Sequence, residues 1–166
     1  NLQTEEYDQI NPRLPRVHVL SNGDWTLAVS DTGAGVSSCQ GVDITRRSAD
    51  LLRRPQGVFA VVEGAGVRFC LTRAPDYQEQ AAKRAEFAPG YAAFYARKGV
   101  LEGGMSASVH PHVQCEQRTV MVKNHSSKKI KSTVVFYFEP SLTKAADAAA
   151  HPAYSGLFLE SGYDEG

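Results

Sequence analysis

The sequence contains little cysteine and no excess of charge of either sign. Its three cysteines, Cys39, Cys70 and Cys115, lie far apart and form no C-x-x-C pair, so no disulfide framework is expected. Lys and Arg together number 18, and Asp and Glu together also number 18. Because a domain that binds duplex nucleic acid normally carries a clear positive excess, this balance argues against a nucleic-acid partner.

Long apolar runs are missing as well. Runs such as residues 58–62 are far shorter than the ~20 residues of a membrane-spanning helix, so we expect no membrane span in this segment. With 166 residues, of which 42% are hydrophobic, the chain has the size and composition of one globular domain.

Sequence motifs of known catalytic chemistry are also absent. There is no G-x-x-x-x-G-K-[ST] phosphate loop, and the two Gly-Ala-Gly turns lack the third glycine of a dinucleotide fingerprint. Ser155 lacks the glycine two positions earlier that a nucleophile elbow uses. The acids Glu116, Glu139 and Asp147 are too scattered to be paired as glycosidase carboxylates. We therefore predict no catalytic residue in this chain.

His110, His112 and Cys115 are the one cluster of metal-ligand types in the sequence. No fourth ligand lies nearby, and Pro111 is typical of a strand end or edge. We therefore expect no metal site.

From Val17 onward, short alternating runs are separated by turn signals. Asn22-Gly23 lies between residues 17–20 and 25–30 and predicts a hairpin, in which Trp25, Leu27 and Val29 face the core. Further strands are expected at residues 58–62, 67–72, 92–96, 105–110, 118–123 and 130–138. Helices are expected only at 76–85 and at 141–150, where Ser141 would be the N-cap.

The strand at 130–138 has apolar residues on both faces, which is typical of a strand covered on both sides. We therefore predict that Val134, Phe136 and Phe138 are buried. The pattern as a whole predicts an all-β fold, a two-layer antiparallel β-sandwich over residues 17–166, preceded by a polar linker at 1–16.

Seven strings in series resemble those of one enzyme family. They are Leu-Ser-Asn-Gly-Asp-Trp (20–25), Asp-Thr-Gly-Ala-Gly-Val-Ser (31–37), Asp-Ile-Thr-Arg (43–46), Glu-Gln-Arg (116–118), Asn-His-Ser (124–126), Tyr-Phe-Glu-Pro-Ser-Leu (137–142), and Asp147 followed by His-Pro-Ala-Tyr-Ser-Gly-Leu-Phe (151–158). The series resembles the N-terminal β-sandwich of the glycoside phosphorylases of glycoside hydrolase family 94, nearest the cyclic β-1,2-glucan synthase and β-1,2-oligoglucan phosphorylase branch. The sequence departs from the family at Val36 and Arg47, where an aromatic residue is usual.

The resemblance implies a super-sandwich of the galactose-mutarotase type, incomplete at its C-terminal end. It implies that catalysis belongs to an (α/α)6 barrel outside this chain, where phosphate or a sugar hydroxyl attacks the anomeric carbon with inversion. This segment would be inactive alone and need no cofactor, inorganic phosphate being a co-substrate of the full enzyme. Its partners would be the barrel, a β-glucan oligosaccharide and a second subunit in a homodimer, in the cytoplasm or the cytoplasmic part of an inner-membrane synthase.

Three residues are candidates for binding substrate: Arg46, Asp50 and His151. Arg46 has a planar fork of donors suited to a glucan or to the barrel, although a salt bridge to Asp50 is an equal alternative. His151 is favoured as a turn residue that ends the Ala-rich helix over a sugar ligand. Glu116 and Arg118 are expected to form a weak cross-strand ion pair.

Two other functions remain open at this stage. One is a free-standing carbohydrate-binding β-sandwich. The other is a mutarotase-like enzyme, which needs a Glu and a His in one groove that the sequence does not provide. Because an incomplete sandwich exposes a strand edge and apolar surface, we also expect self-association, with residues 157–159, including Phe158, at the contact.

Overall fold

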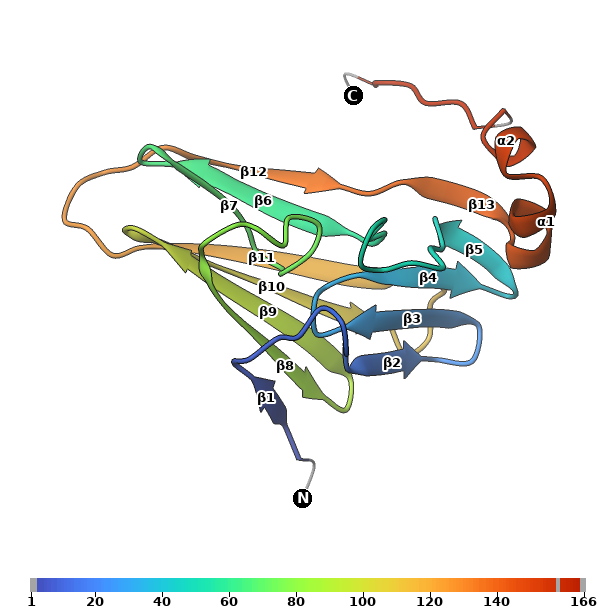
Figure 1. The fold of residues 1–166 in the computed structure, drawn as a ribbon, viewed down its shortest axis with the longest axis horizontal. Helices are drawn as coiled ribbons and strands as arrows, with labels where there is room; N and C mark the ends of the chain where they lie inside the picture. The colour runs from blue at the N-terminus through green and yellow to red at the C-terminus, as the bar shows by residue number, and fades with distance from the viewer. Residues whose placement is uncertain (1–2, 158, 165–166) are drawn as a thin grey trace.

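The computed structural model describes residues 3–157 and 159–164, which form thirteen strands and two short helices (Figure 1). The all-β fold is confirmed. The strands are β1 (Glu5–Tyr7), β2 (Val17–Ser21), β3 (Trp25–Ser30), β4 (Gly35–Cys39), β5 (Val42–Thr45), β6 (Phe59–Gly64), β7 (Val67–Cys70), β8 (Ala82–Ala88), β9 (Tyr91–Lys98), β10 (Leu101–Val109), β11 (Glu116–Asn124), β12 (Ser132–Tyr137) and β13 (Pro140–Lys144), and the helices are α1 (Ala145–Ala150) and α2 (Pro152–Ser155).

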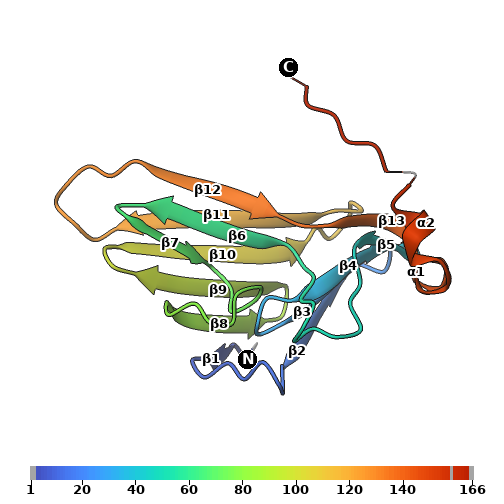
Figure 2. The same ribbon diagram turned by 45° about the horizontal axis from the view of Figure 1, so that its top comes forward.

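The strands form three antiparallel sheets in two layers (Figure 2). The first sheet has the order β1-β8-β9-β10-β11, the second β13-β5-β4-β3-β2 and the third β12-β6-β7. One apolar core contains residues from all three, including Leu27 of β3, Phe69 of β7 and Phe94 of β9. The second and third sheets therefore share the layer that packs against the first sheet.

The hairpin predicted at Asn22-Gly23 is confirmed. Strands β2 and β3 pair antiparallel, with Leu20 opposite Leu27, and Gly23 takes the positive φ of +99° that such a turn favours. Leu27 and Val29 are buried as predicted. Trp25 is only partly buried.

The next turn, residues 30–34, is deeply buried. The hydroxyl oxygens of Ser30 and Thr32 lie 2.7 Å apart, and Asp31 is fully buried, which raises the pKa of its carboxyl group. Gly33 has a φ of +87°, and a Cβ there would lie 2.3 Å from Cγ2 of Thr72. This turn therefore packs tightly against the chain that follows β7.

The helix predicted at residues 76–85 is wrong, because residues 82–88 form strand β8 between β1 and β9. Ala85 and Phe87 of β8 are buried in the main core. Glu79 and Lys83, whose spacing suits a helix, instead pair between a loop and the strand over 2.6 Å. Burial and strand pairing outweigh the helical propensity of this segment.

The second predicted helix is shorter than expected. Residues 145–150 form α1, whereas Ser141 lies in β13 and does not cap the helix. No helix of the described residues is long and apolar enough to cross a membrane.

The segment for which the sequence predicts a linker contributes a strand. Residues 5–7 form β1 and pair with β8, with Tyr7 opposite Ala85. The Tyr7 ring packs edge-on against Phe87 at 5.4 Å, and the Arg16 guanidinium lies 4.5 Å from the centre of the Tyr7 ring. These contacts hold the N-terminal segment against the first sheet.

Strand β12 is not covered on both sides as predicted. Val134, Phe136 and Phe138 are 37%, 47% and 49% exposed, so the prediction that they are buried is wrong. Val134 and Phe136 pair with Val62 and Ala60 of β6 and so share their core-facing side. The first sheet ends at β11, and β12 lies along the outer margin of its own layer (Figure 1). The described residues therefore cover this side of β12 only in part.

A polar cluster joins the two layers at the first residues of β11. The Trp25 Nε1–H donates a hydrogen bond of 3.2 Å to Oε2 of Glu116, and the Ser37 hydroxyl donates to the same oxygen. Arg118 donates from Nε to Oε1 over 2.8 Å. Glu116 and Arg118, which the sequence predicts to pair across two strands, therefore pair within the single strand β11. Because Glu116 and Arg118 are largely buried, removing either partner would leave the other charge buried and unpaired, which costs more than breaking a surface ion pair.

We predict that Gly33→Ala destabilises the fold by about 3–4 kcal/mol, because overpacking against Thr72 adds to the strain of a positive φ. Gly41 is a matched control, since its φ is +83° and a Cβ there would meet nothing within 4 Å. Gly41→Ala should cost only about 1 kcal/mol. Denaturant unfolding measures both values, and equal effects would contradict the packing described for residues 30–34.

Candidate functional site

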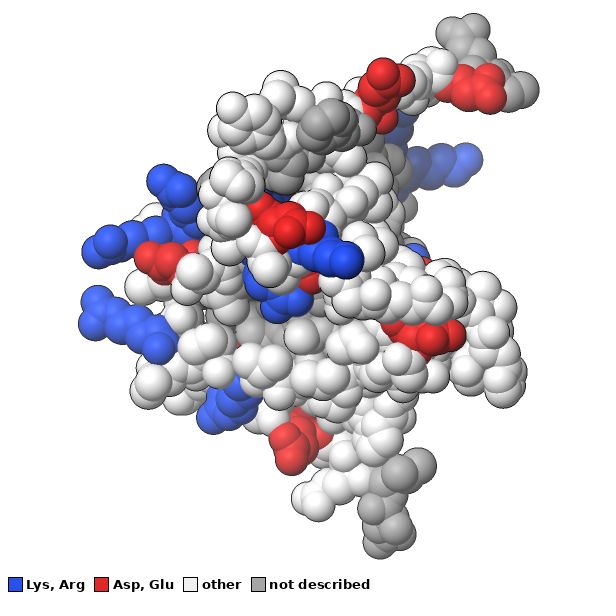
Figure 3. Space-filling model, turned by 90° about the vertical axis from the view of Figure 1, so that its right-hand side faces the viewer, with Lys and Arg blue, Asp and Glu red and all other residues white. Residues whose placement is uncertain are grey.

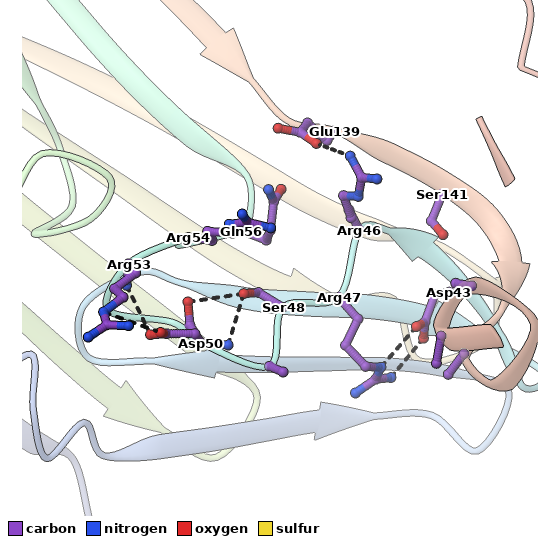
Figure 4. Close-up of a pocket in the computed structure, with 14 residues that line it drawn as sticks. Asp43, Arg46, Arg47, Ser48, Asp50, Arg53, Arg54, Gln56, Glu139 and Ser141 are labelled. Atoms are coloured by element: carbon purple, nitrogen blue, oxygen red, sulfur yellow. Dashed lines mark hydrogen bonds and ion pairs between the residues drawn. The ribbon is translucent and has the colours of Figure 1, made fainter. Parts of the chain in front are cut away.

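A hollow of about 1030 Å³ lies between the loop that follows β5, strand β13 and helix α1 (Figure 4). Four arginines line it, Arg46, Arg47, Arg53 and Arg54, together with the acids Asp43, Asp50 and Glu139 and the alanines of α1. At this end of the molecule, acidic and basic side chains lie interspersed (Figure 3). The hollow is therefore polar and of mixed charge.

Arg46 is tied to Glu139 and not to Asp50. Its NH1 lies 2.8 Å from Oε2 of Glu139, and its backbone N–H donates to the Glu139 carbonyl, also over 2.8 Å. The two residues meet because β5 and β13 pair, with Pro140 opposite Thr45. Hydrogen bonds from Arg46 and from the Tyr137 hydroxyl lower the pKa of Glu139 below its usual value.

Arg47, which the sequence analysis did not propose as a site residue, forms the better-defined ion pair. Its Nε and NH2 donate to the two carboxylate oxygens of Asp43 over 2.9 and 2.7 Å. Asp43 is almost completely buried, and its hydrogen bonds raise the pKa of the Arg47 guanidinium. The spacing of four residues between acid and base is the signal that would have pointed to this pair.

Asp50 organises the turn of the loop. Its Oδ1 accepts hydrogen bonds from the backbone N–H groups of Leu52 and Arg53 over 3.1 and 3.0 Å. The bond from the Arg53 backbone is the main cause that lowers the pKa of Asp50. Asp50 thus behaves as an N-terminal cap of a turn, with Arg53 Nε 3.9 Å away.

His151 lies outside the lining of the hollow. It sits between α1 and α2, where its N–H donates to the Asp147 carbonyl and its own carbonyl accepts from Tyr154. The structure therefore brings Arg46 and Asp50 into one hollow and leaves His151 apart from them, in the position of a turn residue.

The hollow suits binding better than acid catalysis. A general acid needs a raised pKa, but hydrogen bonds lower the pKa of both Glu139 and Asp50. The side chains of Arg46 and Arg47 are each 51% exposed, and a carboxylate holds each guanidinium in place. Because their acids fix their orientation, their remaining N–H groups are positioned donors for a polar partner.

The histidine-cysteine cluster has a structural arrangement. The His112 backbone N–H donates to Nδ1 of His110 over 3.1 Å, and the two rings lie 6.3 Å apart. Asn22 donates to the His110 and Val113 carbonyls, which fastens this loop to the first hairpin. Across the described residues, no three His, Cys, Asp or Glu side chains gather as a metal site would require.

We predict that Glu139→Gln lowers the free energy of unfolding by about 0.5–1 kcal/mol near neutral pH. A carboxyl whose pKa is lowered by folding contributes stability above its unfolded pKa and loses it as pH falls through the folded pKa. The difference between variant and parent should therefore shrink below about pH 4. Urea unfolding across this range tests it, with the exposed Glu63→Gln as control. A difference that stays constant with pH would exclude the ion pair as its source.

Comparisons with known proteins agree with the resemblance seen in the sequence. The family model described as the supersandwich domain of glycosyl hydrolase 94 matches residues 3–166. The chain is 26% identical over 145 residues to the cyclic beta-(1,2)-glucan synthase NdvB of Rhizobium meliloti (strain 1021). That match covers 86% of this chain but 5% of the synthase, so the chain spans a small part of this relative. The chain belongs to the glycosyl hydrolase 94 supersandwich domain family.

Proposed function

We propose that this chain is the non-catalytic N-terminal β-sandwich of an enzyme that makes or phosphorolyses β-linked glucans. The enzyme would be of the β-1,2-glucan phosphorylase or cyclic glucan synthase type. The family match and the similarity to a relative described as a cyclic glucan synthase support this proposal. The sandwich would support an (α/α)6 catalytic barrel and contribute contacts between the subunits of a homodimer.

The observation that carries the proposal is the hollow beside α1. Carboxylates anchor the guanidiniums of Arg46 and Arg47. The lowered pKa of Glu139 makes its carboxyl group poorly suited to donate a proton. Such a surface offers directional hydrogen bonds without a reacting group. We therefore assign Arg46 and Asp50 to contact with the barrel. Inorganic phosphate and the glucan would bind in the barrel, in the cytoplasm or on the cytoplasmic side of an inner-membrane synthase.

The free donors of the hollow also favour a second candidate, a carbohydrate-binding module that works without a barrel. Arg46 uses NH1 for Glu139, and its other N–H groups could reach sugar hydroxyls. Against this, the described residues that line the hollow include no aromatic side chain on which a sugar ring could stack. His151, the third proposed sugar ligand, lies outside the lining.

We predict that the purified chain releases no glucose 1-phosphate from β-1,2-gluco-oligosaccharides and phosphate, and does not hydrolyse them. The physical reason is that hydrogen bonds lower the pKa of Glu139 and Asp50, so neither carboxyl group is suited to act as a general acid. Titration calorimetry with the same oligosaccharides should show no binding. Activity that survives re-purification would refute the non-catalytic role. Binding that is lost in Arg46→Ala but kept in Arg13→Ala, an exposed arginine elsewhere, would favour the binding module.

A further inference from the structure

Three chain reversals meet at the end of the molecule opposite the hollow, on the left of Figure 1. They join β6 to β7, β9 to β10, and β11 to β12. Gly64 of β6 pairs with Ser132 of β12, and Leu101 of β10 pairs with both Lys98 of β9 and Asn124 of β11. The three reversals therefore lie side by side, and we call residues 63–68, 97–102 and 123–131 the tip.

The tip carries a large excess of positive charge. Its acids are Glu63 and Glu102, and its seven cations are Arg68, Arg97, Lys98, Lys123, Lys128, Lys129 and Lys131. All of these cations except Lys98 are exposed. In the whole chain, basic and acidic residues are equal in number, so positive charge is concentrated at this one end.

Ion pairs neutralise little of this charge. Among the residues that the structure describes, Lys98 is the one tip cation in an ion pair, with its Nζ 3.1 Å from Oε1 of Glu79. The Glu102 carboxylate lies 2.6 Å from Nε2 of His125. The other six cations form no ion pair with a described acid, so their charges are available to a partner.

The loop that carries most of the lysines has a fixed shape. The Asn124 side-chain amide donates to the Lys128 carbonyl over 2.7 Å, and Oδ1 of Asn124 accepts from the Ser126 backbone N–H over 2.9 Å. The His125 backbone N–H donates to the Val100 carbonyl over 2.8 Å. These bonds hold the loop against the turn between β9 and β10, so its lysines are presented together with the cations of that turn.

We propose that the tip binds an anionic phospholipid surface. The ammonium group of lysine is a compact, strongly hydrated point charge that needs no fixed partner geometry, and each lysine near an anionic bilayer raises affinity about fivefold. The tip lies at one end of the longest axis of the molecule, where its three reversals can approach a flat surface together (Figure 1). The inference goes beyond the proposed function, since it holds for the sandwich of a phosphorylase or of a synthase.

Other anionic partners fit the tip less well. The tip contains no Phe, Tyr or Trp on which the bases of a single-stranded nucleic acid could stack. An acidic protein surface is best recognised by arginine forks that bind carboxylates in pairs, whereas five of the seven tip cations are lysines. Lysines on adjoining turns are better suited to the diffuse charge of lipid headgroups.

The test is co-sedimentation of the 166-residue chain with lipid vesicles at low salt. We expect binding to vesicles of phosphatidylglycerol and phosphatidylcholine in equal parts, no binding to phosphatidylcholine alone, and progressive release as salt increases. The double variant Lys128→Glu with Lys129→Glu should lower the partition coefficient at least about tenfold. Lys128→Arg with Lys129→Arg keeps the charge and should change it by less than about twofold.

The matched control is Arg13→Glu with Lys144→Glu, because both residues are exposed, lie outside the tip and give the same change in net charge. This variant should lower the partition coefficient less than about threefold. Circular dichroism checks that each variant is folded.

Four results would overturn the inference. They are absence of binding to the anionic vesicles at low salt, equal binding to the neutral vesicles, equal losses in the tip and control reversals, and tighter binding of single-stranded RNA than of vesicles through the same two lysines. The last result would assign the tip to a nucleic acid.

Discussion

The two layers of this sandwich end at different places, and this mismatch governs much of the surface. The first sheet ends at β11, whereas the facing layer continues to β12. Val120 and Val122 of β11 therefore pack only partly into the core, and Val134 and Phe136 of β12 do not reach it. Apolar side chains that a full partner sheet would bury remain in contact with water, which is unfavourable in proportion to their exposed area. Within the described residues, the apolar side chains of β12 are therefore only partly covered.

The hollow and β12 are linked through one short segment. Glu139 lies between β12 of the third sheet and β13 of the second, and its bonds to Arg46 fasten this crossing to the loop after β5. The same loop packs Leu51 against a small second core around Phe59 and Cys70. From the first sheet, Glu116 of β11 bonds across the layers to Trp25 and Ser37. Buried and half-buried carboxylates therefore hold the layers together where apolar packing ends.

The sequence predicts the local features of this fold better than the long-range ones. The Asn22-Gly23 hairpin follows from turn chemistry and alternation within a few residues, and strands β2 and β3 pair antiparallel on either side of it. Strand β8 is missed because β1, one of the two strands that pair with it, is remote in sequence. The other, β9, follows after only Pro89 and Gly90, a turn signal that would have indicated the hairpin. Apolar residues on both faces of β12 resemble a central strand, since the pattern cannot show where the opposite sheet stops.

The candidate site shows the same limit. Arg46 is found from the Asp-Ile-Thr-Arg string (43–46) and Asp50 as an acid near it in sequence, and both line the hollow. The partner of Arg46 is 93 residues away, so no local pattern selects Glu139 over the nearby Asp50. His151 is the residue for which the local interpretation holds, because its backbone bonds lie within the turn between two short helices.

The central claim is that carboxylates hold the two layers together where apolar packing ends. The free energy of unfolding of Glu116→Gln, measured with denaturant, tests this most directly, because Glu116 accepts hydrogen bonds from Trp25, Ser37 and Arg118. The account predicts a loss of about 3 kcal/mol, since the Arg118 charge is left buried without its partner, and a loss below about 0.5 kcal/mol for Glu63→Gln, an exposed acid. Losses of equal size in the two variants would contradict it.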